Sequence, residues 1–379
     1  MSEFLDQVLG RLDVEQWHRE VRRATRRQVE RVLARRQPRP EDAPALFSRA
    51  ARDLLEPLAR RARAVTLARF GRTVTLYAPL YLSNHCINHC RYCGFAAGRD
   101  IERRSLSLDE AERQAAILVE QGIRHVLLLT GEHPARYGLD EICRVAERLR
   151  PRVASLSVEI FPCDEAGYRR LAAAGVDGVT LYQETYLPGL YARLHPAGPK
   201  RDFAARLGAI EAAGRAGMRS LGVGALLGLG PVMLEGSLLA RHAAWLQKRF
   251  PRARVAVSLP RLRPVAGGLA AEHPVSDAEL VQLLVGLRLL LPDAELVIST
   301  REPARLRDRL IPLGVTRMSA GSRTTPGAYG TSIDDAAAGQ FSTDDRRSVA
   351  EVARAIRAAG YDVVTKDFDP AFLGPERAA

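Results

Sequence analysis

Cysteine and tryptophan are scarce in this chain. Among 379 residues there are five cysteines and two tryptophans, and three of the cysteines crowd into one short stretch. An odd and clustered set does not suit a disulfide framework, which excludes the small disulfide-stapled secreted class. A reducing, cytoplasmic compartment is the simplest interpretation.

Long apolar runs are also missing. The sequence contains no run of about 18 apolar residues, so no transmembrane helix is expected. The first residues, MSEFLDQVLGRLDVEQW, lack a basic segment followed by an apolar one, so no secretory signal is predicted. Hydrophobic residues still make up 46% of the chain, which is enough for a large core.

Lysine is rare, although the net charge is +12. The positive charge comes from arginines that alternate with acidic residues at helical spacing, as in QWHREVRRATRRQVERVLARR. Such alternation is typical of a solvated helix face. Because there is neither aromatic interleaving nor a nucleic-acid motif, we expect no nucleic-acid partner.

The chain changes its pattern near residue 72. Residues 1–72 predict helices only, broken near Pro38, Pro40 and Pro44, and hence an N-terminal helical extension. From residue 73 to 320, short β-branched runs alternate with amphipathic stretches, which indicates βαβ units and a parallel sheet. The eight candidate strands are VTLYAPLYL from Val74, HVLLLT from His125, SLSVEI from Ser155, GVTLYQ from Gly178, SLGVGALLG from Ser220, RVAVSLP from Arg254, ELVIST from Glu295 and VTRMSA from Val315.

Eight such repeats predict an α/β fold, a (β/α)8 barrel of the TIM type. One helix should begin at the capping box of Ser107 and Glu110. Residues 321–379 are then a C-terminal loop and a helix, DRRSVAEVARAIRAAG, that close the barrel.

Polar and reactive residues follow the predicted strands. Chemistry in such barrels collects at the C-terminal ends of the strands, so these residues are expected to share one site. They are the cysteines after the first strand, Thr130-Gly131-Glu132-His133 after the second, Glu159 at the end of the third, Glu184 after the fourth, Arg261 after the sixth, Arg301 after the seventh and Ser319 in the eighth.

The clustered cysteines have the spacing C-x3-C-x2-C, at Cys86, Cys90 and Cys93. Structural zinc usually takes four ligands from two knuckles, and no second knuckle is present. A cubane iron–sulfur cluster held by three thiolates keeps one iron open. S-adenosylmethionine can chelate that iron through its amino and carboxylate groups. A zinc site in a non-catalytic protein stays the alternative.

With Tyr92 before its last cysteine, the motif resembles that of the radical S-adenosylmethionine superfamily. Further stretches resemble the aromatic amino acid lyases of that superfamily, and among them the thiamine-biosynthetic tyrosine lyases. The resemblance covers nearly the whole chain. It is carried by YLSNHCINHCRYCGF, LLLTGEH, LYQETY with YARLHP, SLPRLRP, STREP with RDR, MSAGS with PGAYG, and KDF.

The resemblance implies an activity. A reduced [4Fe–4S] cluster splits S-adenosylmethionine, and the resulting radical takes hydrogen from the amino group of L-tyrosine. The Cα–Cβ bond then breaks, giving p-cresol and 2-iminoacetate, which supplies the thiazole ring of thiamine. The implied partners are L-tyrosine, a thiazole synthase and a reductant of the flavodoxin or ferredoxin type.

The resemblance also implies roles for residues. Cys86, Cys90 and Cys93 would ligate the cluster. The residues expected to bind S-adenosylmethionine are Tyr92, Gly131, Glu132, Glu159 and Arg193. The residues expected to serve the substrate and catalysis are Arg301, Ser319 and Glu184.

Arg301 is the expected anchor of the tyrosine carboxylate, because a guanidinium pairs with a carboxylate in a two-pronged geometry. A structural ion pair with Glu302 is the alternative for this residue. Cys143 and Cys163 are expected to be buried structural thiols.

Two sister activities stay open. One is a lyase that acts on tryptophan, and the other is the hydrogenase-maturation enzyme that carries tyrosine on to carbon monoxide and cyanide. That relative has a second cysteine motif in a C-terminal extension, whereas no cysteine follows Cys163 here. The reaction is therefore expected to stop at 2-iminoacetate.

Overall fold

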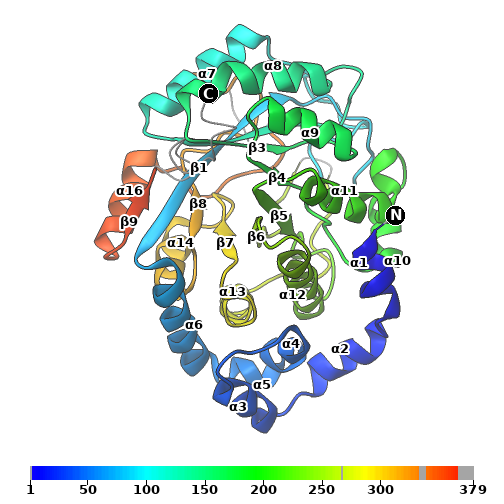
Figure 1. Ribbon diagram of the computed structural model, residues 1–379, viewed down its shortest axis with the longest axis vertical. Helices are drawn as coiled ribbons and strands as arrows, with labels where there is room; N and C mark the ends of the chain where they lie inside the picture. Colours follow the sequence, from blue (N-terminus) through cyan, green and yellow to red (C-terminus); the bar gives the residue numbers. More distant parts are fainter. Residues whose placement is uncertain (1, 266–267, 333–338, 366–379) are drawn as a thin grey trace.

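Figure 1 shows a computed structural model in which parallel strands form a barrel and helices surround it; it describes residues 2–265, 268–332 and 339–365. The eight predicted barrel strands are all present. Their bounds are β1 Thr73–Ser83, β2 His125–Thr130, β3 Ser155–Glu159, β4 Gly178–Thr180, β5 Ser220–Gly224, β6 Arg254–Ser258, β7 Glu295–Ile298 and β8 Arg317–Ser319.

The barrel closes between its first and last strands. The strands follow one another in sequence order from β2 to β8, and β1 pairs with both β8 and β2. All these pairings are parallel; in β1, Thr75 lies opposite Arg317 of β8, and Ala78 lies opposite Val126 of β2. The predicted (β/α)8 barrel is confirmed.

Several strands end earlier than the sequence pattern predicts. The run GVTLYQ extends to residue 183, but β4 ends at Thr180. Four residues later Glu184 has a left-handed φ of 70°, which removes the chain from the extended conformation. The apolar pattern continues past this point because the loops at the barrel mouth are themselves buried.

Helices cover the outside of the barrel and follow its strands along the chain (Figure 1). The predicted capping box is confirmed, since Ser107 caps the first of them and exchanges hydrogen bonds with Glu110. The helices are α7 Leu108–Glu120, α8 Leu139–Leu149, α9 Glu165–Ala173, α10 Pro188–Leu194, α11 Phe203–Arg215, α12 Val232–Arg249, α13 Asp277–Leu290, α14 Ala304–Leu310 and α16 Val349–Ala358.

Alternate residues of the strands face two different apolar regions. Leu76 and Leu80 of β1 belong to the large core between strands and helices. Tyr77 and Tyr81 of the same strand belong to a smaller cluster inside the barrel, against which Cys86 and other residues pack. The inside of the barrel below its mouth is therefore filled by side chains.

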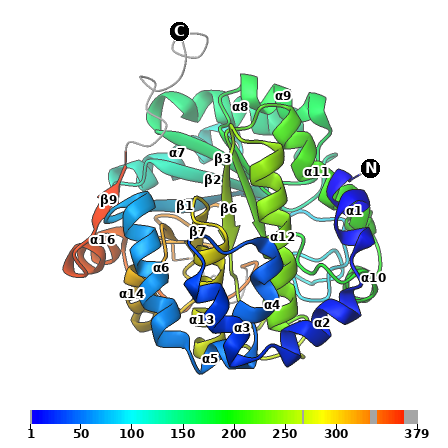
Figure 2. The same cartoon turned by 60° about the horizontal axis from the view of Figure 1, so that its bottom comes forward.

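The N-terminal extension is helical, as predicted, and it wraps around one side of the barrel (Figure 2). Its helices contact α11, α12 and α13. The predicted breaks near Pro38 and Pro40 separate α3 from α4, whereas Pro44 lies in the first turn of α4 and does not break a helix. The helices are α1 Glu3–Gln7, α2 Val14–Arg23, α3 Arg26–Ala34, α4 Ala43–Leu46, α5 Arg49–Arg52 and α6 Leu55–Phe70. Short 3-10 turns lie at Leu9–Arg11, Pro40–Asp42, Arg150–Arg152, Pro199–Arg201 and Ile311–Leu313.

Two buried hydrogen-bonded groups attach the extension to the barrel helices. The indole N–H of Trp17 donates to Ser237 Oγ of α12 at 2.9 Å. The fully buried carboxylate of Glu211 in α11 accepts from Ser2 Oγ at 2.6 Å and from the backbone N–H groups of Glu3 and Phe4. Both contacts join segments that are far apart in the sequence.

The C-terminal part contains the predicted helix as α16, and an additional strand, β9 Asp362–Val364, that the sequence pattern did not predict. This strand pairs with the start of β1, where Thr73 lies opposite Asp362. It is only three residues long, too short to leave a strand pattern. The KDF stretch, residues 366–368, lies outside the described residues. No helix in the described ranges is long and apolar enough to cross a membrane.

Candidate active site

A cavity opens at the mouth of the barrel where the strands end; we call it the outer cavity. It gathers side chains from the loop after β1, the ends of β2 and β3, and the loops after β4, β6 and β7. Most of the residues predicted from sequence line it: Cys86, Cys90, Tyr92, Cys93, Gly131, Glu132, Glu159, Glu184 and Arg301.

A second cavity lies deeper in the barrel; we call it the inner cavity. It is lined by Tyr77, Tyr81 and Ser319 and shares Glu159 and Arg301 with the outer cavity. The predicted residue Ser319 therefore lies in the inner cavity. Its hydroxyl oxygen accepts a hydrogen bond from the Thr300 N–H at 3.0 Å.

The three clustered cysteines face the outer cavity as free thiols. The Phe95 N–H donates to Cys93 Sγ at 3.4 Å, which is a contact suited to a thiolate. Burial raises the pKa of Cys90 to about 12 in the absence of a metal. Within residues 2–265, 268–332 and 339–365, no three His, Cys, Asp or Glu side chains converge on a single-ion site. A cubane cluster takes its thiolates on separate irons, so its ligands need only line one shared cavity.

The turn after β2 brings backbone close to the cysteine loop. The Gly131 N–H donates to Ser83 O at 2.7 Å, and a Cβ at this position would lie 2.2 Å from the carbonyl oxygen of His85. Only glycine fits that approach. Beside it, Thr130 Oγ1 is buried and has no hydrogen-bond partner in the part of the chain that the structure describes. The lining of the outer cavity thus contains a polar atom that no described protein group satisfies.

Glu132 is held by two polar side chains. One of its carboxylate oxygens accepts from Arg206 Nη1 at 2.9 Å, and the other accepts from Asn88 Nδ2 at 2.8 Å. The Glu132 carbonyl also accepts from the Ile87 N–H at 3.1 Å, inside the cysteine loop. Glu132 therefore connects the end of β2 to the cysteine loop and to α11.

Glu184 forms a buried ion pair with Lys200, whose Nζ lies 2.7 Å from Glu184 Oε1. Burial acts to raise the pKa of Glu184, but the positive charges of Lys200 and Arg206 outweigh it and the pKa is lowered. Its left-handed backbone is strained for a residue other than glycine. This charged, strained residue lines the outer cavity.

Glu159 stands at the end of β3, between the two cavities. Burial, reinforced by the nearby Glu184 carboxylate, raises its pKa to about 7. Glu159 has no hydrogen-bond partner among the described residues, so its oxygens can accept from a bound molecule.

Arg301 lies between the same two cavities. Its guanidinium carbon is 3.3 Å from the ring centroid of Phe341, and its Nη1 donates to Arg261 O at 3.4 Å. The alternative ion pair between Arg301 and Glu302 does not form. Glu302 is instead paired with Arg261, whose Nε donates to Glu302 Oε2 at 2.8 Å. Among the described residues, Arg301 has no carboxylate partner.

Arg193 is not brought to either cavity, and its expected role in binding S-adenosylmethionine stays a prediction. It is exposed on α10 and lines neither cavity. The helix directs Leu190 and Leu194 inward instead, and both are buried. Arg193 lies next to Leu194, so it points in another direction on the helix.

Tyr92 lies in the wall of the outer cavity with its hydroxyl directed away from it. His195 Nδ1 is 2.8 Å from the Tyr191 carbonyl, so Nδ1 carries the proton and Nε2 accepts from the Tyr92 hydroxyl at 2.7 Å. Burial lowers the pKa of His195 to about 3, which keeps the ring neutral. The Tyr92 ring is therefore fixed as a packing surface.

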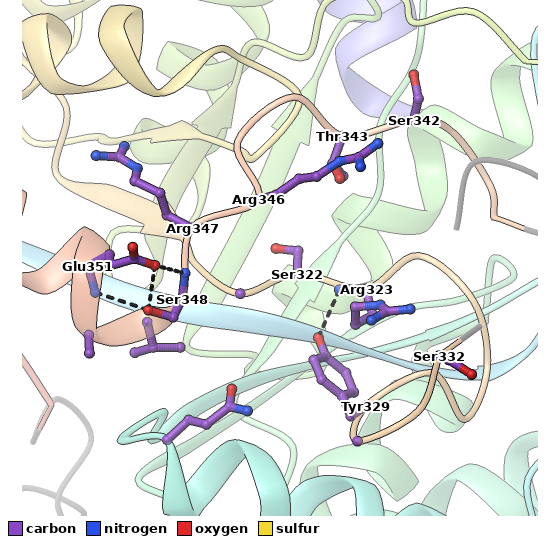
Figure 3. Close-up of a pocket in the computed structure, with 15 residues that line it drawn as sticks. Ser322, Arg323, Tyr329, Ser332, Ser342, Thr343, Arg346, Arg347, Ser348 and Glu351 are labelled. Atoms are coloured by element: carbon purple, nitrogen blue, oxygen red, sulfur yellow. Dashed lines mark hydrogen bonds between the residues drawn. The ribbon is translucent and has the colours of Figure 1, made fainter. Parts of the chain in front are cut away.

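A separate pocket lies between the loop after β8 and the start of α16, and none of the predicted site residues lines it (Figure 3). Its polar groups include the Ser348–Glu351 capping box and Arg347, which pairs with Asp308 and Asp345. We do not assign the active site to this pocket, because the reactive groups lie in the two cavities of the barrel.

Comparison with known proteins identifies the family. Residues 80–235 match the Radical SAM superfamily, and residues 258–362 match the Biotin and Thiamin Synthesis associated domain. Over 347 residues, 91% of this chain and 91% of the relative, the chain is 43% identical to the 2-iminoacetate synthase of Escherichia coli (strain K12). The chain belongs to the 2-iminoacetate synthase family.

Two further relatives agree with this membership. The 2-iminoacetate synthase of Salmonella typhimurium is 42% identical over 342 residues, 90% of each chain. The X-ray structure of the FeFe-hydrogenase maturase HydG from Carboxydothermus hydrogenoformans matches with a TM-score of 0.87 and 32% identity, covering 97% of this chain and 88% of that one. The family resemblance that the motifs indicated is confirmed.

The 2-iminoacetate synthase family belongs to the radical SAM superfamily, which implies a [4Fe–4S] cluster and S-adenosylmethionine. The outer cavity fits these groups. Three thiols face it, Thr130 offers an unpaired hydroxyl beside them, and Gly131 provides a close backbone approach. The predicted domain border at residue 320 falls inside the second family match, and it stays a prediction.

Sequence reasoning missed several residues of the site in this member of the 2-iminoacetate synthase family. Lys200 and Arg206 lie beyond the strand ends, on a 3-10 turn and on α11, so the strand pattern did not point to them. The rarity of lysine was the signal that could have identified Lys200. Asn88 sits inside the cysteine motif at a position that the motif leaves free, and Gln340 and Phe341 come from the C-terminal loop.

Proposed function

We propose that this member of the 2-iminoacetate synthase family is a carbon–carbon lyase that cleaves the Cα–Cβ bond of L-tyrosine. The products are p-cresol and 2-iminoacetate, the precursor of the thiazole ring of thiamine, with 5′-deoxyadenosine and methionine. The membership in the family and the arrangement of the two cavities support this function.

The observation that carries the proposal is Arg301. A half-buried guanidinium without a carboxylate partner among the described residues supports the binding of a substrate carboxylate at this position. The inner cavity below it is lined by aromatic rings and hydroxyls, among them Tyr77, Tyr81 and Ser319. An aromatic amino acid can thus place its carboxylate on Arg301 and its ring toward the inside of the barrel.

The outer cavity then serves the cofactors. Cys86, Cys90 and Cys93 would hold the cluster, which together with S-adenosylmethionine supplies the radical chemistry that breaks the bond. We infer that Thr130 and Gly131 receive the methionyl amino group. The two ribose hydroxyls of S-adenosylmethionine would donate to the free oxygens of Glu159, because one carboxylate can accept from both.

The ion pairs around the outer cavity position these groups. Glu132 fixes the cysteine loop through Asn88 and Ile87, and Glu184 with Lys200 supplies adjacent opposite charges for the polar end of S-adenosylmethionine. The closed barrel wall and the loops at its mouth exclude water from the reacting atoms, which protects 2-iminoacetate and radical species from side reactions.

We also propose partners. A reductant of the flavodoxin or ferredoxin type would supply the electron, and a thiazole synthase would take up 2-iminoacetate before water hydrolyses it. A cytoplasmic location suits these partners and the five reduced cysteines.

The test is anaerobic incubation of the iron- and sulfide-reconstituted protein with dithionite, S-adenosylmethionine and either tyrosine or tryptophan. We expect tyrosine to give p-cresol, together with glyoxylate and ammonium from hydrolysed 2-iminoacetate. Consumption of tryptophan alone would reassign the substrate, and carbon monoxide or cyanide in amounts equal to p-cresol would favour the hydrogenase-maturation reaction. A protein that binds zinc and forms no 5′-deoxyadenosine would refute the enzyme.

A further inference from the structure

The C-terminal segment 339–344 crosses the mouth of the barrel directly over the cysteine loop; we call it the strap. Its backbone is bonded on both sides, since the Gly94 N–H donates to Gln340 O at 3.1 Å and the Gln340 N–H donates to Thr324 O at 3.1 Å. A Cβ on Gly94 would lie 2.6 Å from the carbonyl oxygen of Gly339. The strap and the cysteine loop are therefore packed backbone to backbone.

The strap places the Gln340 side chain between β1 and a cluster ligand. Gln340 Oε1 accepts from the Tyr81 hydroxyl at 2.8 Å, and Gln340 Nε2 donates to Cys93 Sγ at 3.9 Å. Tyr81 is buried, at 3% exposure, and lies on a barrel strand, so one end of the amide has a rigid partner. The other end of the amide is then directed at the sulfur.

The orientation of the amide follows from the chemistry of its two neighbours. A thiolate sulfur only accepts hydrogen bonds, whereas the tyrosine hydroxyl can donate to the amide oxygen. Turning the amide over would place its oxygen against the thiolate. The arrangement with N–H toward the sulfur is therefore favoured on both sides.

Cys93 differs in this respect from the other two cysteines of the motif. Its sulfur also accepts from the Phe95 N–H at 3.4 Å, so two donors face it. In the described ranges of the chain, no hydrogen bond reaches the sulfur of Cys86 or Cys90. Donors to ligand sulfurs stabilise the reduced cluster, because the reduced form carries more negative charge on its sulfurs.

We propose that Gln340 is a positioning residue of the iron–sulfur cluster: held by Tyr81, its side-chain amide donates to the Cys93 thiolate and raises the reduction potential of the cluster. This inference rests on the proposed function, because it needs the cluster to be present. The inference assigns a role in electron uptake to Gln340, which lies almost 250 positions after Cys93 in the sequence.

The experiment is a redox titration of the reconstituted protein without S-adenosylmethionine, followed by electron paramagnetic resonance of the reduced cluster. The variant Gln340→Leu keeps similar volume and removes the donor. We expect its equilibrium constant for reduction to fall about fivefold to tenfold, and tenfold corresponds to a potential lower by about 59 mV. Tyr81→Phe should shift the potential in the same direction by less, because the amide is then free to turn.

A matched control is Gln114→Leu. Gln114 is also a buried glutamine bonded at both ends to the C-terminal part, since its amide donates to Tyr329 O and accepts from Tyr329 N, each at 2.8 Å. We expect this variant to keep the wild-type potential. If Gln114→Leu shifts the potential as much as Gln340→Leu, the effect is a general loosening of the segment and the proposal is wrong.

The remaining outcomes also decide the question. A wild-type potential in Gln340→Leu, with full iron content, overturns the inference and leaves the proposed function intact. If Gln340→Leu does not hold iron, Tyr81→Phe carries the test, because it removes only the hydroxyl that orients the Gln340 amide and leaves the amide itself in place. A lowered potential then supports the proposal, and an unchanged one refutes it. If the wild-type protein assembles no cluster, the proposed function fails and the inference fails with it.

Discussion

The role assigned to Arg301 leads to a quantitative prediction for the variant Arg301→Gln. The guanidinium is half-buried, lines both cavities and lacks an ion-pair partner among the described residues, so the substrate carboxylate would be its main hydrogen-bonded anionic partner. A hydrogen bond to a charged group contributes about 1.5–3 kcal/mol. Losing it should raise the KM for tyrosine, or lower kcat/KM, by about 10- to 150-fold.

The assay is formation of p-cresol against tyrosine concentration, with 5′-deoxyadenosine measured in the same samples. Tyrosine-independent cleavage of S-adenosylmethionine should survive in Arg301→Gln, because the proposed partner of Arg301 is the tyrosine carboxylate and not a ligand of the cluster. Arg301→Lys should recover only part of the loss, since an ammonium keeps the charge but not the two-pronged geometry.

Arg263→Gln is the matched control for this prediction. Arg263 is another arginine in the lining of the outer cavity, but it forms an ion pair with Asp344 of the strap. We expect its KM for tyrosine to stay within about threefold of wild type, because a partly exposed ion pair contributes only about 0–1 kcal/mol. Wild-type kinetics in Arg301→Gln, or equal losses in both variants, would refute the assignment of the carboxylate to Arg301.

Three further predictions follow from other parts of the molecule. Cys90→Ala should lose the cluster and all formation of 5′-deoxyadenosine. Cys143→Ala changes a residue of the helix α8 and should keep both. Iron analysis and product assays measure these outcomes. Only the ionised form of Glu159 can accept two hydroxyls, and its pKa is about 7. Below that pKa, the affinity for S-adenosylmethionine should increase by up to about tenfold for each pH unit, and above it the affinity should stay constant. Equilibrium binding should show no such slope in Glu159→Gln; an identical slope there would assign the titration to another group. Glu211→Ala leaves Ser2 Oγ and two backbone N–H groups without their acceptor, so urea unfolding should show a loss of about 2–3 kcal/mol; an unchanged midpoint would contradict the role given to this contact.

The barrel and the position of the site could be predicted from the sequence because both depend on local patterns. Runs such as HVLLLT mark a strand by composition alone, and β2 has the predicted bounds. The residues at or just after the end of each run must lie at the barrel mouth, so Gly131, Glu159 and Arg301 could be brought together without coordinates. The cysteines needed only their spacing.

The remaining residues of the site could not be predicted, because contacts between distant segments decide their roles. Arg206 is a helix residue by pattern, and only the fold shows that it reaches Glu132. The sequence left open an ion pair between Arg301 and Glu302, and only the fold shows that Glu302 pairs with Arg261 instead. Arg193 shows the opposite case: the motif suggested a site position, but in the fold its side chain on α10 is exposed to solvent.

The attachment of the N-terminal helices has a consequence for how the chain folds during synthesis. Ser2 and Trp17 leave the ribosome early, but their partners Glu211 and Ser237 follow 209 and 220 residues later. At about 5–20 residues per second, this interval is roughly 10–40 s. During that time the apolar faces of α1 and α2 have no barrel to pack on. The extension can therefore complete its fold only after most of the barrel has been made.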